Sequence, residues 1–260
     1  MSGYILCQTK KAEQPYFVEN ISTNIYSIEE LCYYLYHNLY LIDKTIINEG
    51  LCTWLEKELG MEKLAAKLRP HLGKYAQAED ILYPIFKEIN YLTYEELRIL
   101  NGQLAKMDTE PLLLREKKKG DSLVENGIYA GAIRVYQKLL ETEKTEEVRE
   151  GFTAGILRNL GCAYAYLFQM EKAARCFKDA YTRGGDVEDL TKYLLAMHEI
   201  LSAKEYKALL KEEKISSEVC AAADALLKEF SGPSVQEISM EEVDAVLDKC
   251  TKEYHRSTGS

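Results

Sequence analysis

The residues that most often carry out catalysis are scattered through this sequence. Its four histidines stand apart, at positions 37, 71, 198 and 255. There is no H-E-x-x-H zinc motif, no G-x-S-x-G nucleophile elbow, no glycine-rich phosphate loop and no acidic calcium loop. A general base or a nucleophile needs a partner at hydrogen-bond distance, and no local spacing supplies one. We therefore expect a protein that is not an enzyme, although a site built from dispersed residues stays open.

The cysteines do not form a metal-binding pattern. The seven stand at positions 7, 32, 52, 162, 176, 220 and 250, with no two closer than 14 residues. The C-x-x-C pairs typical of zinc ribbons and thioredoxin-like sites are absent. His37 with Cys52 or His71 is a combination that a helical bundle could bring together, but nothing local determines its geometry. We expect reduced, mostly buried thiols, no metal and no other cofactor.

The charge balance argues against a nucleic-acid partner. Lysine and arginine number 33, against 42 aspartate and glutamate residues, which gives a net charge of −9. A nucleic-acid binder needs a cationic face to displace the counterions of the phosphates. The one candidate run, Arg115-Glu116-Lys117-Lys118-Lys119, is followed at once by Asp121 and Glu125. We interpret it as a solvated helix face rather than a phosphate-binding patch.

The hydrophobic pattern also argues against a membrane partner. The longest uncharged stretches, residues 31–42 and 159–170, have 12 residues each, whereas a membrane-spanning helix needs about 20. The first residues have no basic region before their apolar run, as a signal peptide would. We therefore predict a cytoplasmic location.

The elements that must position any site are predicted to be helices. Only 5 prolines and 15 glycines interrupt the chain. Four capping boxes, each a serine or threonine followed three residues later by glutamate, mark helix starts at Ser27, Thr93, Ser202 and Ser239. Apolar residues follow them at helical spacing. We predict an all-α protein with more than half of its residues in helices.

The N-terminal part is expected to be a helical bundle over residues 27–108. Tyr4–Cys7 and Tyr16–Val18 are short β-prone runs in front of it and predict a small hairpin. Pro84 lies inside an apolar helical stripe, where it predicts a kink or a break.

Tyrosine is unusually frequent, with 19 residues against 6 phenylalanines and 1 tryptophan. At about 100° per residue, Tyr33, Tyr36 and Tyr40 share one face of the first predicted helix. Tyrosine is enriched at interfaces because it combines a large contact area with a hydroxyl group. This face is therefore expected either to pack inside the protein or to form a binding surface.

An internal repeat follows Pro111. Two segments share the same order of small and aromatic residues: Gly120, Ala132 and Tyr136 in the first, and Gly161, Ala173 and Phe177 in the second. Glycine and alanine are 12 residues apart in both, and alanine and the aromatic residue 4 apart. With Leu160-Gly161-x-x-Tyr164 before Ala173-x-x-x-Phe177-x-x-Ala180, residues 113–186 resemble the tetratricopeptide repeat (TPR) family. The resemblance implies helical hairpins that stack into a solenoid.

The spacing of the two copies predicts one long helix. Gly120 and Gly161 are 41 residues apart, seven more than the family's 34-residue repeat. Seven residues are about two helical turns, so the extra length can extend a helix without rotating its packing face. We expect the helix through Val148, Phe152, Ile156 and Leu160 to be unusually long.

The resemblance also implies a binding surface. In the TPR family, ligands lie in a concave face formed by the first helix of each repeat. The residues of this chain that the resemblance places there are Lys117, Asp121, Asn159, Cys162 and Tyr166.

One TPR subgroup clamps the C-terminal carboxylate of a peptide, and Lys117 and Asn159 match two of its five positions. Asp121 stands where that subgroup has asparagine and would repel a carboxylate. Asp189 and Tyr193 replace the cations of its third repeat. A general groove for a peptide or a partner helix is therefore favoured over a carboxylate clamp.

These observations together predict three regions: an N-terminal helical domain (1–108), a TPR-like domain (109–230), and a linker with a terminal helix and frayed tail (231–260). The expected function is that of an adaptor or scaffold that binds another protein or a peptide. The alternative is a peptide-responsive regulator whose N-terminal domain acts on DNA. Residues 20–60, with two cations and six anions, speak against it. The oligomeric state is not indicated.

Because no cluster of ligand residues exists in the sequence, the purified protein should contain no stoichiometric zinc or iron. Elemental analysis measures this directly, and one equivalent of either metal per chain would contradict the expectation.

Overall fold

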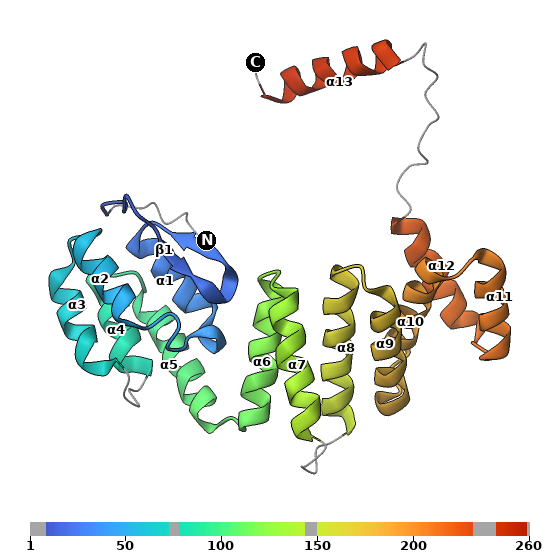
Figure 1. Ribbon diagram of the computed structural model, residues 1–260, viewed down its shortest axis with the longest axis horizontal. Helices are drawn as coiled ribbons and strands as arrows, with labels where there is room; N and C mark the ends of the chain where they lie inside the picture. Colours follow the sequence, from blue (N-terminus) through green and yellow to red (C-terminus); the bar gives the residue numbers. More distant parts are fainter. Residues whose placement is uncertain (1–8, 73–77, 144–149, 231–242, 259–260) are drawn as a thin grey trace. The chain divides into compact units, whose positions relative to one another are not determined.

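The computed structural model describes residues 9–72, 78–143, 150–230 and 243–258, and most of them lie in helices (Figure 1). Helix occupies more than half of the chain, as the composition and the capping boxes predict. Within the described ranges the only sheet is a two-stranded one. The all-α prediction is confirmed.

The chain divides into two compact units, Met1–Ala203 and Lys204–Ser260. In the first unit, the elements up to the repeat region are β1 (Tyr16–Val18), η1 (Glu19–Ile21), β2 (Thr23–Ile25), α1 (Ile28–His37), η2 (Leu39–Leu41), α2 (Glu49–Lys57), α3 (Glu62–Leu68), η3 (Arg69–His71), α4 (Ala78–Glu88) and α5 (Tyr94–Thr109). The repeat region contains α6 (Leu112–Glu125), α7 (Tyr129–Glu143), α8 (Glu150–Tyr166), α9 (Met170–Gly184) and α10 (Val187–Ile200). The second unit contains α11 (Ala203–Glu212), α12 (Ser217–Phe230) and α13 (Val243–Thr258). The predicted boundaries near residues 108 and 230 stay predictions.

The N-terminal helices surround one apolar core. Its fully buried side chains include Ile28, Leu31, Leu35, Leu51, Leu55, Leu64, Leu68, Leu82 and Ile85. Local caps determine where the helices begin. The Glu30 amide donates to Ser27 Oγ at 3.2 Å, and Thr93 and Glu96 form a complete capping box at the start of α5. The helix starts expected at these two residues are confirmed.

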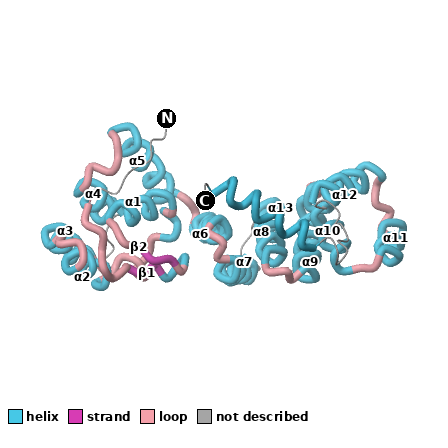
Figure 2. Tube along the Cα trace, turned by 90° about the horizontal axis from the view of Figure 1, so that it is seen from above, coloured by secondary structure: helices cyan, strands magenta, loops and turns pink. Residues whose placement is uncertain are grey.

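The hairpin in front of the bundle differs from the predicted one. β1 pairs antiparallel with β2, so that Tyr16 lies opposite Ile25 (Figure 2). The expected partner, Tyr4–Cys7, lies outside the described residues. The strand Thr23–Ile25 was not predicted, because a run of three residues is too short to show an alternation of apolar and polar side chains. The two strands are held in place by the burial of Val18 and Ile25 against the core.

Pro84 does not break its helix. α4 runs from Ala78 to Glu88 with Pro84 inside it. A proline in a helix interior removes one backbone hydrogen bond and costs about 3 kcal/mol. Leu82, Ile85 and Phe86, which flank it, are buried, and burying three such side chains offsets a loss of that size.

Two glycines set how closely the helices of the repeat region approach. The helices α6 to α10 pack in chain order, each against the next (Figure 1). A Cβ atom at Gly120 would lie 2.5 Å from the ring of Tyr136, and one at Gly161 would lie 2.6 Å from the ring of Phe177. Neither position has room for a side chain, so each ring packs directly on the backbone of the preceding helix. Stacking of these pairs into a solenoid stays a prediction.

The long helix expected before Gly161 is α8, which has 17 residues and is the longest helix among the described residues. It exceeds α6, with 14 residues, by less than one turn. Val148 and its neighbours 144–149 lie outside the described residues.

The turns that close α6 and α8 have the same backbone geometry but different residues. Gly127 has a φ of 74° after α6, and Phe168, 41 residues later, has a φ of 56° after α8. In both turns the next amide reaches back five residues: Ile128 N–H donates to the Leu123 carbonyl at 2.8 Å, and Gln169 N–H to the Tyr164 carbonyl at 2.9 Å. Glycine adopts this left-handed conformation freely, whereas a side chain there costs about 1–2 kcal/mol.

Replacing Gly161 by leucine should destabilise the protein. The new side chain would overlap the Phe177 ring and force α8 and α9 apart, which should lower the free energy of unfolding by about 1–3 kcal/mol or more. Denaturant titration measures this change. The control is Gly102→Leu, because a Cβ atom at Gly102 meets nothing within 4 Å. Equal stabilities of the two variants would show that α8 and α9 do not meet at Gly161.

Replacing Phe168 by glycine should stabilise the protein. The substitution relieves the left-handed strain, and little packing is lost because Phe168 is 86% exposed. We expect the free energy of unfolding to rise by about 1 kcal/mol. The reverse test is Gly127→Ala, which should lower it by a similar amount. A lower stability of Phe168→Gly would mean that the ring makes contacts that outweigh the strain.

Candidate functional site

Asp121 is the centre of a hydrogen-bond network that joins α6, α7 and α8. Lys117 Nζ, one turn earlier on α6, lies 2.7 Å from Asp121 Oδ2. The Tyr136 hydroxyl on α7 donates to Asp121 Oδ1 at 2.6 Å, and Asn159 Nδ2 on α8 donates to the same oxygen at 2.7 Å. The TPR resemblance placed Lys117, Asp121 and Asn159 on one binding face. In the structure, Lys117 and Asn159 both contact Asp121.

Tyr136 enters this network from inside the protein. Its side chain is fully buried, and its ring rests on the backbone at Gly120. Burial, together with the hydrogen bond to the Asp121 carboxylate, raises the pKa of Tyr136 above its ordinary value. The hydroxyl therefore remains a donor and holds the carboxylate in position.

The network occupies the two residues that match the carboxylate-clamp subgroup. In this chain Lys117 and Asn159 both bind a carboxylate already, that of Asp121. The site is therefore satisfied internally and does not await the carboxylate of a ligand. What stays available is the Asn159 carbonyl and the remaining N–H groups of Lys117.

Cys162 and Tyr166 lie on the same helix but outside the network. Burial raises the pKa of the Cys162 thiol, which disfavours the nucleophilic thiolate form. Tyr166 is 60% exposed at the end of α8, about two turns from Asn159. Its ring stacks on Tyr129, with ring centres 4.5 Å apart and planes 5° apart. The structure thus separates Tyr166 from the polar residues predicted to act with it.

A second polar contact, not expected from the sequence, joins α8 to α10. Arg158 binds the fully buried Asp189 through Nε at 2.5 Å and through a terminal nitrogen at 2.7 Å. It also binds Asp186, the N-cap residue of α10, at 2.6 Å. In the resemblance to the TPR family, Asp189 only replaces a cation of the third repeat. An acidic residue within an apolar helical stripe, as Asp189 is, indicates a buried carboxylate that needs a cationic partner.

The three lysines of the basic run on α6 are paired rather than solvated. Lys118 contacts the Glu110 carboxylate and donates to the Tyr40 hydroxyl at 2.7 Å, and Tyr40 in turn donates to Glu110 at 2.9 Å. Lys119 lies 3.3 Å from Asp43. With Lys117 bound to Asp121, each of these lysines has a carboxylate partner. The solvated-face interpretation was wrong for these lysines, because α6 packs against η2 and its lysines meet the carboxylates of Asp121, Glu110 and Asp43.

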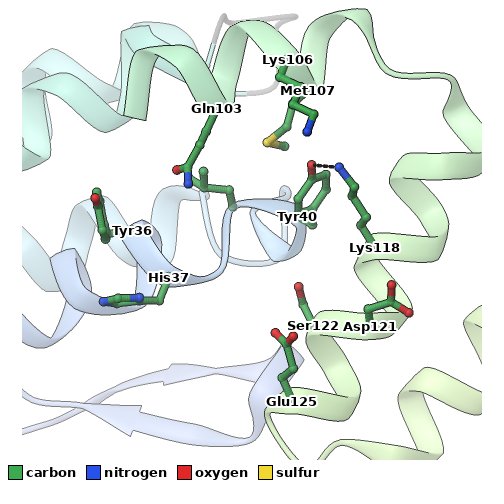
Figure 3. A pocket seen from close by; sticks show the side chains of 11 residues that line it. Tyr36, His37, Tyr40, Gln103, Lys106, Met107, Lys118, Asp121, Ser122 and Glu125 are labelled. Carbon is green, nitrogen blue, oxygen red and sulfur yellow. Dashed lines mark hydrogen bonds between the residues drawn. The ribbon is translucent and has the colours of Figure 1, made fainter. Parts of the chain in front are cut away.

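A polar pocket of about 420 Å³ opens where the N-terminal helices meet α6 (Figure 3). The lining side chains come from three places: Tyr36, His37, Leu39 and Tyr40 around the end of α1; Gln103, Lys106 and Met107 from α5; and Lys118, Asp121, Ser122 and Glu125 from α6. A pocket of this size is large enough for a peptide side chain or a small molecule. Asp121 belongs to both the pocket and the network, so the two are continuous.

The tyrosines of the tyrosine-rich face have different surroundings. Tyr36 and Tyr40 line the pocket, and Tyr36 also meets Phe86 edge to face. Tyr33, in contrast, is exposed. Tyr36 thus packs inside the protein, as the first alternative predicts, and a binding role for this face stays a prediction.

Two further properties concern the described part of the chain. No three histidine, cysteine, aspartate or glutamate side chains in it are grouped so that they could hold a metal ion. None of its helices combines the length and the apolar character needed to cross a membrane.

No protein-family model matches this chain, and comparisons with curated proteins and with solved structures find no match either. The function proposed below therefore rests on the residues of this chain.

The stability of the protein should fall above pH 10. The pKa of Tyr136 is raised in the folded state, so the folded protein keeps this proton while the unfolded chain, with an ordinary tyrosine pKa of about 10, loses it. The stabilisation is complete below pH 10 and is lost as the pH rises toward the pKa of the folded state.

Tyr136→Phe should reduce the slope of the free energy of unfolding against pH above pH 10, by up to about 1.4 kcal/mol per pH unit. Denaturant titrations between pH 8 and 11 measure it. Tyr94→Phe, at a side chain that is 84% exposed, serves as the control. An unchanged slope in Tyr136→Phe would contradict the role given to this hydroxyl.

Proposed function

We propose that this protein is an adaptor or scaffold that binds an extended peptide or a partner helix on the face formed by α6 and α8. The observation that carries the proposal is the orientation of Lys117 and Asn159 by Asp121. A binding surface gains affinity when its polar groups are held in place before the ligand arrives, because less freedom is lost on binding. The proposed partner is another protein or a peptide.

The Asn159 amide is suited to a peptide backbone. Asp121 takes one of its N–H groups at 2.7 Å, which fixes the plane of the amide. The carbonyl oxygen then remains as a positioned acceptor. An extended peptide can donate a backbone N–H to it, which is the way main-chain recognition supplies affinity without selecting a particular sequence.

Lys117 and the neighbouring pocket would add selectivity. Lys117 is bound to Asp121 through one contact and retains N–H groups for a carbonyl oxygen of the ligand. The pocket of about 420 Å³ begins at Asp121 and has room for one side chain of the ligand. Its lining contains aromatic rings, two lysines, an aspartate and a glutamate, which favours an amphipathic side chain over a purely apolar one.

The packing of the helix pairs supports the same proposal. Glycine meets an aromatic ring at the same place in both pairs, at Gly120 with Tyr136 and at Gly161 with Phe177. We include in the proposal that residues 113–186 are TPR-like and that the protein works in the cytoplasm. The net charge of −9 agrees with a protein partner rather than a nucleic acid.

The test starts from a peptide display library selected against the immobilised full-length protein. The dissociation constant of an enriched peptide is then measured for the wild type, Asn159→Ala and Lys117→Met. We expect at least tenfold weaker binding for Asn159→Ala, equivalent to about 1.4 kcal/mol, a typical value for lost hydrogen bonds. The matched control is Lys138→Met, on the exposed side of α7.

Two outcomes would contradict the proposal. The first is a library from which no peptide is enriched. The second is a set of enriched peptides that bind Asn159→Ala and Lys117→Met as tightly as the wild type. Melting temperatures of all variants are measured alongside, so that lost binding is not confused with lost folding.

A further inference from the structure

Phe168 combines two properties that folding alone would not favour. Its φ of 56° lies in the left-handed region, where the equivalent turn after α6 has Gly127. Its side chain is 86% exposed, so the ring makes few contacts that could offset the strain. Backbone strain of this kind is concentrated at functional positions, because the surrounding structure maintains it for another purpose. Here the strained backbone holds an aromatic ring out into solvent.

Phe168 does not stand alone. With Tyr129, Tyr166 and Leu167 it forms what we call the aromatic ridge, at the turns after α6 and α8. The stacked rings of Tyr129 and Tyr166, 4.5 Å apart, join the two turns. Tyr166 is 60% exposed and Leu167 37%. Rigid, exposed aromatic side chains are the usual anchors of protein interfaces.

The charges beside the ridge are acidic. Glu125, before the first turn, and Glu171, after the second, are exposed and make no ion pair among the described residues. The one cation within four residues of either turn, Lys172, is engaged: its Nζ donates to Gln169 Oε1 at 2.9 Å and lies over the Tyr164 ring. The whole chain carries a charge of −9. A complementary partner therefore has a basic rim.

We propose that the aromatic ridge is a second interaction surface, separate from the Asn159 face. Its partner is a protein with an apolar pocket that receives the Phe168 ring and a rim of lysine or arginine that faces Glu125 and Glu171. A second copy of this chain fits poorly, because it would bring two charges of −9 together. An anionic lipid surface is disfavoured by the same two glutamates.

The first experiment identifies the partner and the contact point. A photo-crosslinking phenylalanine analogue replaces Phe168 in the full-length protein, expressed in cells of its source. The control carries the analogue at Tyr94, which is equally exposed at 84%. We expect a crosslink from position 168, and not from position 94, to one protein. Mass spectrometry should place the linked residue in an apolar pocket bordered by lysine or arginine.

The second experiment uses that partner in purified form. Phe168→Gly should weaken binding at least tenfold without lowering the melting temperature, which separates lost contact from lost folding. Glu171→Gln should slow association and reduce its dependence on salt. Asn159→Ala should bind this partner like the wild type, so failure here is distinguishable from failure of the adaptor proposal.

The proposal would be overturned by a crosslink to a second copy of the chain, to lipid or to nothing. Equal crosslinking from positions 94 and 168 would overturn it too. Unchanged affinity of Phe168→Gly for the purified partner would show that the ridge is not the surface that binds.

Discussion

The close contact between a glycine and an aromatic ring is the constraint on which the repeat region depends. At Gly120 and Gly161 the backbone of one helix is exposed to the ring of the next, Tyr136 or Phe177, with no space for even a methyl group. Dispersion attraction is strongest when atoms are in close contact. A residue larger than glycine at either position would overlap the ring. The separation of the helices in each pair follows from this contact.

The Asp121 network is a consequence of the same contact. Because the Tyr136 ring lies flat on α6 at Gly120, its hydroxyl reaches Asp121 at 2.6 Å. Phe177, at the equivalent place in the second pair, has no hydroxyl and supports no such network. The hydroxyl oxygen of Tyr136 therefore distinguishes the two otherwise similar helix pairs. Because it positions Asp121, the candidate binding face lies at α6 and α8.

Charge pairing joins α6 to the N-terminal helices. Successive lysines point in directions about 100° apart, so that Lys117 meets Asp121 on its own helix, while Lys118 and Lys119 meet Glu110 and Asp43. Half-buried ion pairs of this kind are stabilising mainly because removal of one partner leaves a charge poorly solvated. Two of these residues, Lys118 and Asp121, also line the pocket at this junction.

The sequence by itself determined the parts of the structure that depend on neighbours within one or two turns. Capping at Ser27 and Thr93 involves residues three apart, and the two glycine–aromatic pairs were visible from their equal spacing. The physical reason is that helical periodicity and capping are local and repeat at fixed intervals.

Only the tertiary structure decided which of these groups bind one another. Asn159 and Asp121 are 38 residues apart, and Lys118 and Tyr40 are 78 apart. No local rule relates such positions, because their distance depends on how closely whole helices pack. The pairing of β1 with β2, the buried contact of Arg158 with Asp189 and the strained exposure of Phe168 have the same origin. Each depends on the energy of packing and desolvation summed over the fold. The hydrophobic pattern of the sequence indicates which helix faces are buried, but it does not indicate which polar groups meet at those faces.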